Sequence, residues 1–454
     1  MIDNALLKKI NSTATDEIFK ELYGESEVDA ARQRYTTLIT EMLNGGNGFP
    51  EAELGDSAKN LRIFSAPGRT ELAGNHTDHN RGKVLAASIQ LDCVAVVRER
   101  SDNIVFFRSV GFPDVKVKLT DSSGAPDLQP KPEERGTTSA LVRGIASELY
   151  RRSCKVGGFS ANAMTTVFPG SGLSSSAAVE ALLCRIFDSL YGEGKRSPLE
   201  IAQIGQIAEN IYFGKPCGLM DQTACSTGGA VAIDFADVER PIVKQINFSA
   251  AGYVLCVVNT GGSHADLTAD YASIPAEMKA TAAFFGKSVL RELEKETVLN
   301  RAAEVRKALG DRALLRSLHF FDENARVDAM TAALLEMENA LTSAEKQEAL
   351  NRYLEMVNES GDSSWKYLQN VYSPSAPASQ GISAALAMTK DFLRQQKLRG
   401  ACRVHGGGFA GTIQAYIPQE AMDAYRARME TVFGSGSLTM LRIRKKGAVE
   451  LFAD

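Results

Sequence analysis

The sequence lacks the patterns that mark several large classes of protein. Its seven cysteines are an odd number and form no Cys-x-x-Cys pair, which argues against a disulfide framework and a zinc knuckle. No uninterrupted apolar run approaches the about 18 residues of a membrane span, and the first residues contain no apolar signal core. Lysine and arginine number 51 against 55 acidic residues, without a concentrated basic face. We therefore expect a soluble, cytoplasmic protein without a nucleic-acid or membrane partner.

Two common nucleotide-binding patterns are also missing. The sequence contains no Gly-x-x-x-x-Gly-Lys-Ser/Thr, which excludes a Walker-type NTPase. Gly406, Gly408 and Gly411 match Gly-x-Gly-x-x-Gly, but residues 412–417 after them alternate like a strand. Because the dinucleotide fingerprint requires a helix at that point, we reject a dinucleotide site there.

The 454 residues, 44% of them hydrophobic, suffice for a large core and for two or three domains. Residues 1–60 predict a polar, helical lead-in, and residues 401–433 resemble the end of a split βαβ lobe. Periodicity predicts strands at 62–66, 84–88, 91–98, 104–109, 115–119, 159–167, 253–259, 401–405 and 412–417, and helices at 30–43, 138–151, 198–212, 380–396 and 419–433.

A serine-rich loop at residues 168–178, Phe-Pro-Gly-Ser-Gly-Leu-Ser-Ser-Ser-Ala-Ala, carries the strongest chemical signal. It predicts a glycine-rich turn that opens a helix. Such a turn presents unpaired N–H groups and the positive end of the helix dipole, which suits a phosphate chain, and its hydroxyls can ligate a metal. On local chemistry alone, an ordinary serine-capped helix remains the alternative.

Two further glycine-rich loops, 67–82 and 404–411, and an acidic loop around Asp221 complete the pattern. If they converge, they suit phosphoryl transfer to a small polyhydroxylated acceptor, which needs a cation, a carboxylate and precise positioning. Simpler interpretations stay open: Arg69 can pair with a surface acid, and Asp221 can cap a turn. A transition-metal site at His76, Asp78 and His79 is disfavoured because neighbouring turn residues point apart.

These motifs, together with Pro-Cys-Gly-Leu-Met-Asp-Gln at 216–222, resemble in order the signatures of the GHMP kinases, and of galactokinases in particular. The resemblance implies an α+β fold with two lobes and the active site between them. One lobe would be like domain 2 of ribosomal protein S5, and the other ferredoxin-like. The expected divisions are an N-terminal helical extension at 1–60, an N-terminal kinase domain at 61–245 and a C-terminal kinase domain at 246–454.

The resemblance also assigns roles by position and implies ATP, Mg²⁺ and a small sugar as partners. Asp221 and Arg69 would be catalytic, with the guanidinium keeping the carboxylate ionised for its action on the sugar's anomeric hydroxyl. The sugar would contact Asn75, His76, Asp78, Gly218, Asp221 and Tyr271. The phosphates of ATP would contact Gly170, Ser171, Gly172, Leu173, Ser174, Ser175 and Ser176, and Mg²⁺ would contact Ser175 and Glu209.

One departure bears on the substrate. Where galactokinases usually have Gly-Glu-His-Thr-Asp-Tyr-Asn, this chain has Asn75 in place of the glutamate and His79 in place of the tyrosine. The leading expectation is a kinase that makes galactose 1-phosphate. The lost charge leaves a galacturonate 1-kinase or a related hexose kinase as the alternative. A non-catalytic galactose and ATP sensor is a weaker hypothesis, because Arg69, Asp221 and the serine loop are all present.

Overall fold

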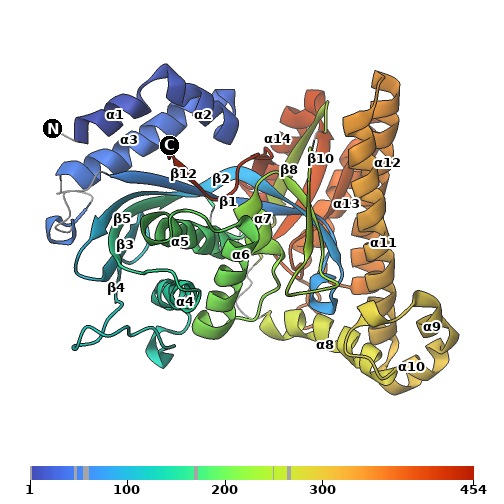
Figure 1. Cartoon of the computed structure of the whole chain (residues 1–454). Coiled ribbons are helices and arrows are strands. Elements are labelled where there is room, and N and C mark those ends of the chain that lie inside the picture. The colour runs from blue at the N-terminus through green and yellow to red at the C-terminus, as the bar shows by residue number, and fades with distance from the viewer. Residues whose placement is uncertain are drawn as a thin grey trace.

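Two β-sheets form the framework of the chain in a computed structural model that describes residues 3–44, 49–54, 61–167, 172–248, 250–262 and 267–453 (Figure 1). The strands are β1 Arg62–Ala73, β2 Lys83–Arg100, β3 Ile104–Ser109, β4 Val115–Lys118, β5 Gly158–Thr165, β6 Ala230–Asp234, β7 Ile242–Ile246, β8 Tyr253–Asn259, β9 Ala401–His405, β10 Thr412–Pro418, β11 Leu438–Leu441 and β12 Val449–Leu451. The α-helices are α1 Asp3–Ile10, α2 Thr13–Tyr23, α3 Val28–Asn44, α4 Thr138–Arg151, α5 Ser175–Tyr191, α6 Pro198–Ile207, α7 Met220–Thr227, α8 Thr268–Phe284, α9 Lys295–Asn300, α10 Ala302–Leu309, α11 Asp311–Asn339, α12 Ser343–Ser363, α13 Gly381–Gln395 and α14 Met422–Phe433.

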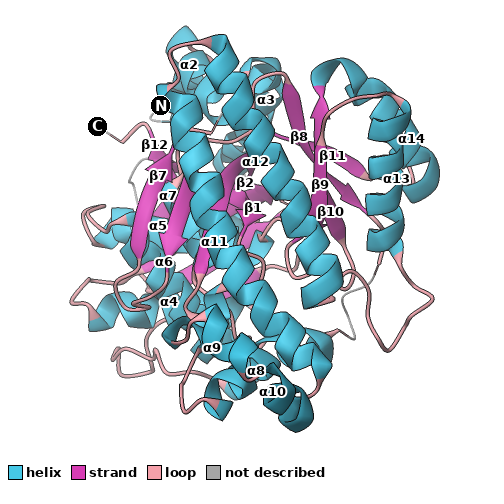
Figure 2. Ribbon diagram, turned by 90° about the vertical axis from the view of Figure 1, so that its right-hand side faces the viewer, coloured by secondary structure: helices cyan, strands magenta, loops and turns pink. Residues whose placement is uncertain are grey.

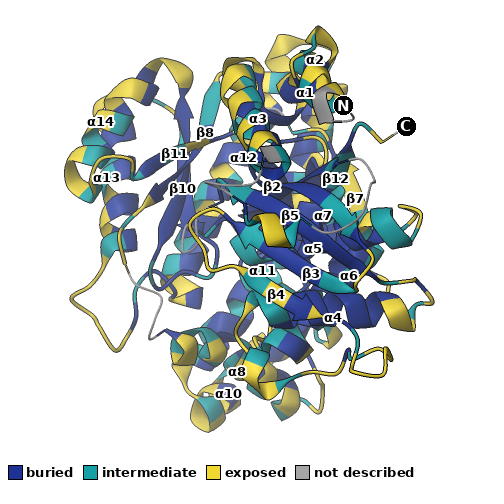
Figure 3. Cartoon of the chain, turned by 90° about the vertical axis from the view of Figure 1, so that its left-hand side faces the viewer, coloured by how far each residue is buried: buried dark blue, intermediate teal, exposed yellow. Residues whose placement is uncertain are grey.

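The larger sheet has eight strands in the order β12-β1-β2-β5-β3-β4, with β6 paired to β2 and β7 paired to β6. Both of its faces are covered by helices, and β2 shows why. Val94 and Val96 point toward the N-terminal helices, whereas Cys93, Ala95 and Val97 pack in the core that contains residues of α4 and α5. This alternation follows from the two-residue repeat of a strand, and it leaves the strands buried between helical layers (Figure 3).

The N-terminal helices α1 to α3 are packed onto the larger sheet (Figure 1). Phe19 and Tyr35 are fully buried there, and their rings stack with centroids 5.1 Å apart. The buried carboxylate of Asp92 on β2 accepts a hydrogen bond of 2.6 Å from Tyr23 and pairs with Arg34 at 2.8 Å. The lead-in predicted for residues 1–60 is therefore helical in its described part and shares a core with the sheet.

The smaller sheet has the order β11-β8-β10-β9, with every neighbouring pair antiparallel. Numbered along the chain, this is 4-1-3-2, the split βαβ arrangement expected for the C-terminal part. Figure 2 shows the long helices α11 and α12 in front of both sheets. On β8, Leu255 and Val257 face the core that includes α11 and α12, whereas Cys256 and Val258 face α13 and α14.

Strand β1 connects the two sheets and differs from the prediction. The strand expected at residues 62–66 continues through Pro67 to Ala73, with register shifts at Pro67/Arg69 and Glu71/Ala73. A proline is tolerated there because a bulge interrupts the ladder of hydrogen bonds. Beyond the first shift, Thr70 accepts a hydrogen bond of 2.8 Å from Gln414 on β10. The carboxyl end of β1 therefore carries the first glycine-rich loop to the junction of the two sheets.

Two other local predictions are corrected. The strands expected at 84–88 and 91–98 form one long strand, β2, and Asp221 lies in the first turn of α7 instead of in a loop. The predicted strand and helix boundaries elsewhere agree with the structure to within a few residues. Across the described ranges, no helix is both long and apolar enough to cross a membrane.

Candidate active site

Arg69 and Asp221 form a two-pronged ion pair where three segments meet. Arg69 comes from β1, and its Nε and Nη2 atoms donate to the two carboxylate oxygens of Asp221 at 2.7 and 2.8 Å. Its third nitrogen donates to the carbonyl of Gly172 at 2.5 Å, and Ser174 donates its hydroxyl to Asp221. The fold thus brings the first motif, the serine loop and α7 into direct contact.

The two members of this pair differ in exposure. The side chain of Arg69 is 7% exposed and that of Asp221 is 32% exposed, so the carboxylate faces outward from a buried guanidinium. Burial alone would raise the pKa of Asp221, but the charge and hydrogen bonds of Arg69, with Ser174, outweigh it and hold the pKa below its usual value. The pair therefore presents a carboxylate that stays ionised, the form that accepts a proton.

Asp78 and Gly218 approach each other beside this pair. A β-carbon placed on Gly218 would overlap a carboxylate oxygen of Asp78, so any larger residue would require the Asp78 side chain to move. The other oxygen of Asp78 accepts from the backbone N–H of His79 at 3.0 Å, which fixes the carboxylate at the end of the first loop. The structure brings these two predicted sugar-binding residues together.

The glycine turn of the third motif binds three more predicted sugar-binding residues through consecutive carbonyls. Asn75 donates to the carbonyl of Gly406 at 2.6 Å, and the His76 ring lies 2.9 Å from that of Gly407. Tyr271 donates its hydroxyl to the next carbonyl, that of Gly408, at 2.9 Å. The turn from the smaller sheet therefore orders side chains from the first loop and from α8.

The Asn75 amide is buried, and both of its polar atoms are engaged. Besides Gly406, its nitrogen donates to Glu71 at 3.0 Å, and its oxygen accepts from Asn370 at 2.8 Å. Glu71 in turn pairs with Arg403, whose side chain is fully buried. The amide of Asn75 thus lies against a carboxyl group four residues earlier in the chain, and that group is paired with an arginine.

The pKa of the His76 ring is also shifted. Burial is the main cause, and it lowers the pKa of His76 to about 4 even though the Gly407 carbonyl acts in the other direction. The ring is therefore neutral near pH 7. Among the described residues, no group of three or more His, Cys, Asp or Glu side chains is arranged to hold a metal ion.

A buried acidic cluster lies next to Asp221. Glu209 sits in a π-helical turn, Ala208–Phe213, and one of its oxygens lies 3.2 Å from the ammonium group of Lys215. The other oxygen accepts from Gln222 at 2.9 Å, and the same nitrogen of Gln222 donates to Glu180 at 3.0 Å. Burial, together with the charge of Glu209, raises the pKa of Glu180 well above its usual value.

This cluster offers oxygen ligands to a divalent cation. Its carboxyl groups are hard donors of the kind that Mg²⁺ prefers, and the phosphates of a bound nucleotide would have to supply further ligands. Oε1 of Glu180 is buried without a hydrogen-bond partner among the described residues, so the cluster keeps one unused acceptor. Ser175, the other predicted metal ligand, is the first residue of α5.

The described part of the serine loop forms the start of α5. Gly172 and Ser174 both have a positive φ, of 71° and 58°, and α5 begins immediately after them. A β-carbon on Gly172 would lie 2.8 Å from the Thr412 hydroxyl, so the turn is closely packed on β10. Ser175 and Ser176 are the first two residues of α5, and the contacts of residues 172–176 with the ATP phosphates stay a prediction. Gly170 and Ser171 lie outside the described residues.

Sequence reasoning missed several residues that support this site: Glu71, Glu180, Gln222, Asn370 and Arg403. Gln222 directly follows Asp221 in its motif, and Glu71 lies in the first glycine-rich loop, so these two positions were the available signals. Glu180, Asn370 and Arg403 lie far apart in the sequence, and only the fold brings them together. His405, to which no chemistry was assigned, is buried and lies 3.0 Å from both Thr70 and Thr412.

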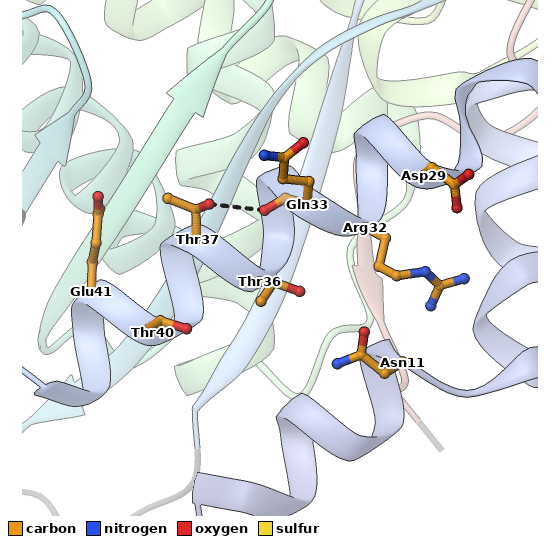
Figure 4. Close-up of a pocket in the computed structure, with 8 residues that line it drawn as sticks. All are labelled: Asn11, Asp29, Arg32, Gln33, Thr36, Thr37, Thr40 and Glu41. Atoms are coloured by element: carbon orange, nitrogen blue, oxygen red, sulfur yellow. Dashed lines mark hydrogen bonds between the residues drawn. The ribbon is translucent and has the colours of Figure 1, made fainter.

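A separate hollow of about 590 Å³ lies on the N-terminal helices α1 and α3 (Figure 4). Its walls include Asn11, Gln33, Thr36 and Thr40, and none of its lining residues is a predicted site residue. It has no cluster of charges directed at one point, so it does not compete with the Arg69 and Asp221 region as the candidate active site.

Comparisons with known proteins agree with this geometry. Residues 140–229 match the family described as GHMP kinases N terminal domain, and residues 51–99 match the galactokinase galactose-binding signature. A galactokinase from Streptomyces coelicolor is 30% identical over 388 residues, which cover 84% of this chain and 91% of that protein.

The chain belongs to the galactokinase family of the GHMP kinases. It is thus a sugar kinase, a phosphotransferase, and ATP binding is implied by the family. The crystal structure of Lactococcus lactis galactokinase complexed with galactose superposes with a TM-score of 0.73 at 24% identity, covering 93% of this chain and 100% of that one. A mevalonate kinase superposes with a TM-score of 0.56 at 13% identity, covering 84% and 98%. The predicted two-lobed GHMP kinase fold is confirmed.

Proposed function

We propose that this galactokinase-family enzyme transfers the γ-phosphoryl group of ATP to the anomeric hydroxyl of galactose, giving galactose 1-phosphate. The observation that carries the proposal is the exposed Asp221 carboxylate held by Arg69 beside Gly172 and Ser174. This arrangement supports a carboxylate that accepts the hydroxyl proton and a cation that offsets charge on the transferring group. The galactokinase relatives and the galactose-binding signature support the choice of sugar.

In this proposal, different residues of the site bind the sugar, the ATP phosphates and the metal. Asp78, with His76 and Tyr271, would accept or donate hydrogen bonds to the ring hydroxyls, and the missing side chain of Gly218 lets the Asp78 carboxylate approach that backbone closely. The start of α5 would bind the ATP phosphates through backbone N–H groups. Glu209 and Ser175 would hold Mg²⁺, which when bound neutralises phosphate charge.

The charges around the site favour a neutral C6 group over a carboxylate. Both polar atoms of the Asn75 side-chain amide are hydrogen-bonded within the protein. The buried side chain of Arg403 forms an ion pair with Glu71. Among the described residues of the site, Arg69 and Lys215 already face the carboxylates of Asp221 and Glu209. A galacturonate carboxylate placed beside Asn75 would therefore meet an amide whose N–H groups are already donated to Glu71 and Gly406.

A sugar panel tests the proposal. Purified protein is incubated with Mg²⁺-ATP and galactose, galacturonate, glucose or N-acetylgalactosamine, ADP release is followed, and the phosphorylated carbon is determined by NMR. We expect galactose to give the highest kcat/KM and the phosphate to be on C1. A preference for galacturonate would reject the substrate, phosphate on another carbon would reject the anomeric assignment, and absence of sugar-dependent ADP release would favour the sensor.

A further inference from the structure

The amide nitrogen of Gln222 bridges two buried carboxyl groups next to the proposed catalytic aspartate. It lies 3.0 Å from an oxygen of Glu180 and 2.9 Å from an oxygen of Glu209. A primary amide nitrogen has two N–H donors, one for each carboxyl group, and the Cys217 sulfur lies 3.5 Å from the same nitrogen as a third, weaker acceptor. The bridge joins α5, the π-helical turn and α7, the elements that follow the serine loop and carry Glu209 and Asp221.

All three side chains are almost completely buried: Glu180 is 0%, Gln222 1% and Glu209 3% exposed. The packing leaves little freedom, because a β-carbon on Gly205 would lie 3.2 Å from an oxygen of Glu180 and 3.4 Å from Cγ of Gln222. Ordinary packing does not require two carboxyl groups in such a place, since burying each of them costs free energy unless it is paired. This cost suggests that the cluster has a purpose besides stability.

The two oxygens of Glu209 have different surroundings. Oε2 points inward to Gln222, whereas Oε1 faces the ammonium group of Lys215, whose side chain is 62% exposed. The inner hydrogen bond fixes the rotation of the carboxylate, so that its other oxygen is presented on the side where a cation already sits. Groups that orient a ligand in this way commonly determine how tightly a metal is held.

We propose that Gln222, anchored by Glu180, is a positioning residue that orients Glu209 toward the metal bound with the nucleotide. The inference rests on the proposed role of Glu209 as a metal ligand. It assigns no contact with substrate to Glu180 or Gln222, and it requires no change in their protonation. Its consequence is that removing the bridge weakens metal binding while galactose binding is retained.

The test measures binding of Mn²⁺ to the full-length enzyme saturated with a non-hydrolysable ATP analogue, followed by electron paramagnetic resonance. Gln222→Leu and Glu180→Leu should each weaken Mn²⁺ binding about 10- to 100-fold, the usual effect of losing such a supporting contact. Glu180→Gln keeps a carbonyl acceptor for Gln222 and should stay within about threefold of the wild type. Galactose affinity, measured by calorimetry, should change less than threefold in all variants.

The controls separate this inference from the role of Glu209 itself. If Glu209→Gln leaves Mn²⁺ affinity unchanged, the proposed metal ligand is wrong. If Glu209→Gln weakens Mn²⁺ binding but Gln222→Leu does not, the ligand stands and the positioning role is overturned. Should either leucine variant fail to fold, Gln222→Asn, whose shorter amide cannot reach both carboxyl groups, replaces it in the same measurement, and wild-type Mn²⁺ affinity in that variant would equally overturn the proposal.

Discussion

Two arginine–carboxylate pairs lie two residues apart on β1 and have opposite properties. Arg69 pairs with Asp221, whose side chain is 32% exposed, whereas Glu71 pairs with Arg403, and both of these side chains are at most 3% exposed. In the first pair the effect of the arginine is larger than that of burial, so the pKa of Asp221 is lowered. In the second pair the effect of burial is larger than that of the arginine, so the pKa of Glu71 is raised. Similar contacts thus give an accessible anion in one place and a sealed structural link in the other.

We therefore assign a catalytic role to Arg69 and Asp221, and a structural role to Glu71 and Arg403. Arg403 lies on β9 and Glu71 on β1, so their contact joins the smaller sheet to the strand that carries the first motif. Buried pairs of this kind are costly to break, because one partner is left as an isolated charge. Variants of the two pairs should therefore fail in different ways.

The largest expected effect is on stability and comes from the sealed pair. Arg403→Met leaves Glu71 buried without its cation and should lower the free energy of unfolding by about 3–5 kcal/mol in urea denaturation. The double variant Glu71→Gln/Arg403→Met removes both charges and should be less destabilised than Arg403→Met alone. A double variant that is as unstable as the single one would show that the charge left behind is not the cause.

Substitutions in the pair of Arg69 and Asp221 should instead lower the rate of turnover. Arg69→Met removes the cation that opposes the effect of burial, so the pKa of Asp221 should rise and the acidic limb of the kcat/KM profile should move to higher pH. We also expect kcat to fall about 100-fold or more. Arg69→Lys keeps the charge without the two-pronged geometry and should recover part of both effects. An unchanged acidic limb in Arg69→Met would separate Asp221 from the observed ionisation.

The His76 ring supplies a pH-dependent contribution to stability. Its pKa falls from 6.5 to about 4 on folding because burial disfavours the charged ring. A lowered pKa means that the contribution is fully present above pH 6.5 and is lost as the pH falls toward 4, by roughly 1–3 kcal/mol. His76→Gln should flatten the pH dependence of the unfolding free energy in this window. His79→Gln, at a ring that is 34% exposed, is the matched control and should leave most of the slope in place, because burial of His76 is the main cause of its lowered pKa.

The smallest effect is expected at Lys215, which faces the outward oxygen of Glu209. Because the ammonium group competes with a metal for that oxygen, Lys215→Met should raise Mn²⁺ affinity by up to about fivefold at low salt, as for an exposed ion pair. The gain should shrink as the salt concentration rises. A loss of Mn²⁺ affinity would instead indicate that Lys215 helps to bind the nucleotide phosphates.

The parts of the fold that could be predicted are those with strong local patterns. The helix over residues 138–151 and the strand over 253–259 were predicted with the observed limits, because apolar periodicity extends along their whole length. β12 has only three residues, and it pairs with β1 although nearly the whole chain lies between the two strands in the sequence. β1 passes through Pro67 and Gly68, which normally signal a turn, because β2 and the register shift stabilise it there.

The candidate site divides in the same way. Arg69, Asp78, Gly218 and Asp221 belong to motifs, so the sequence could nominate them, and the structure brings them together. Their catalytic and binding roles stay predictions. The orientation of Asn75 could not be predicted, because it depends on partners at positions 71, 370 and 406 that no local pattern relates to one another.

The most direct test of the account is the single-turnover rate of phosphoryl transfer at saturating Mg²⁺-ATP and galactose, compared between Asp221→Asn and Glu71→Gln. Both substitutions neutralise a carboxylate that pairs with an arginine and conserve its size. We predict that Asp221→Asn slows the transfer at least about 100-fold with ATP affinity retained, whereas Glu71→Gln slows it less than tenfold. Equal rates in the two variants, or wild-type transfer in Asp221→Asn, would contradict the assignment of chemistry to the exposed pair.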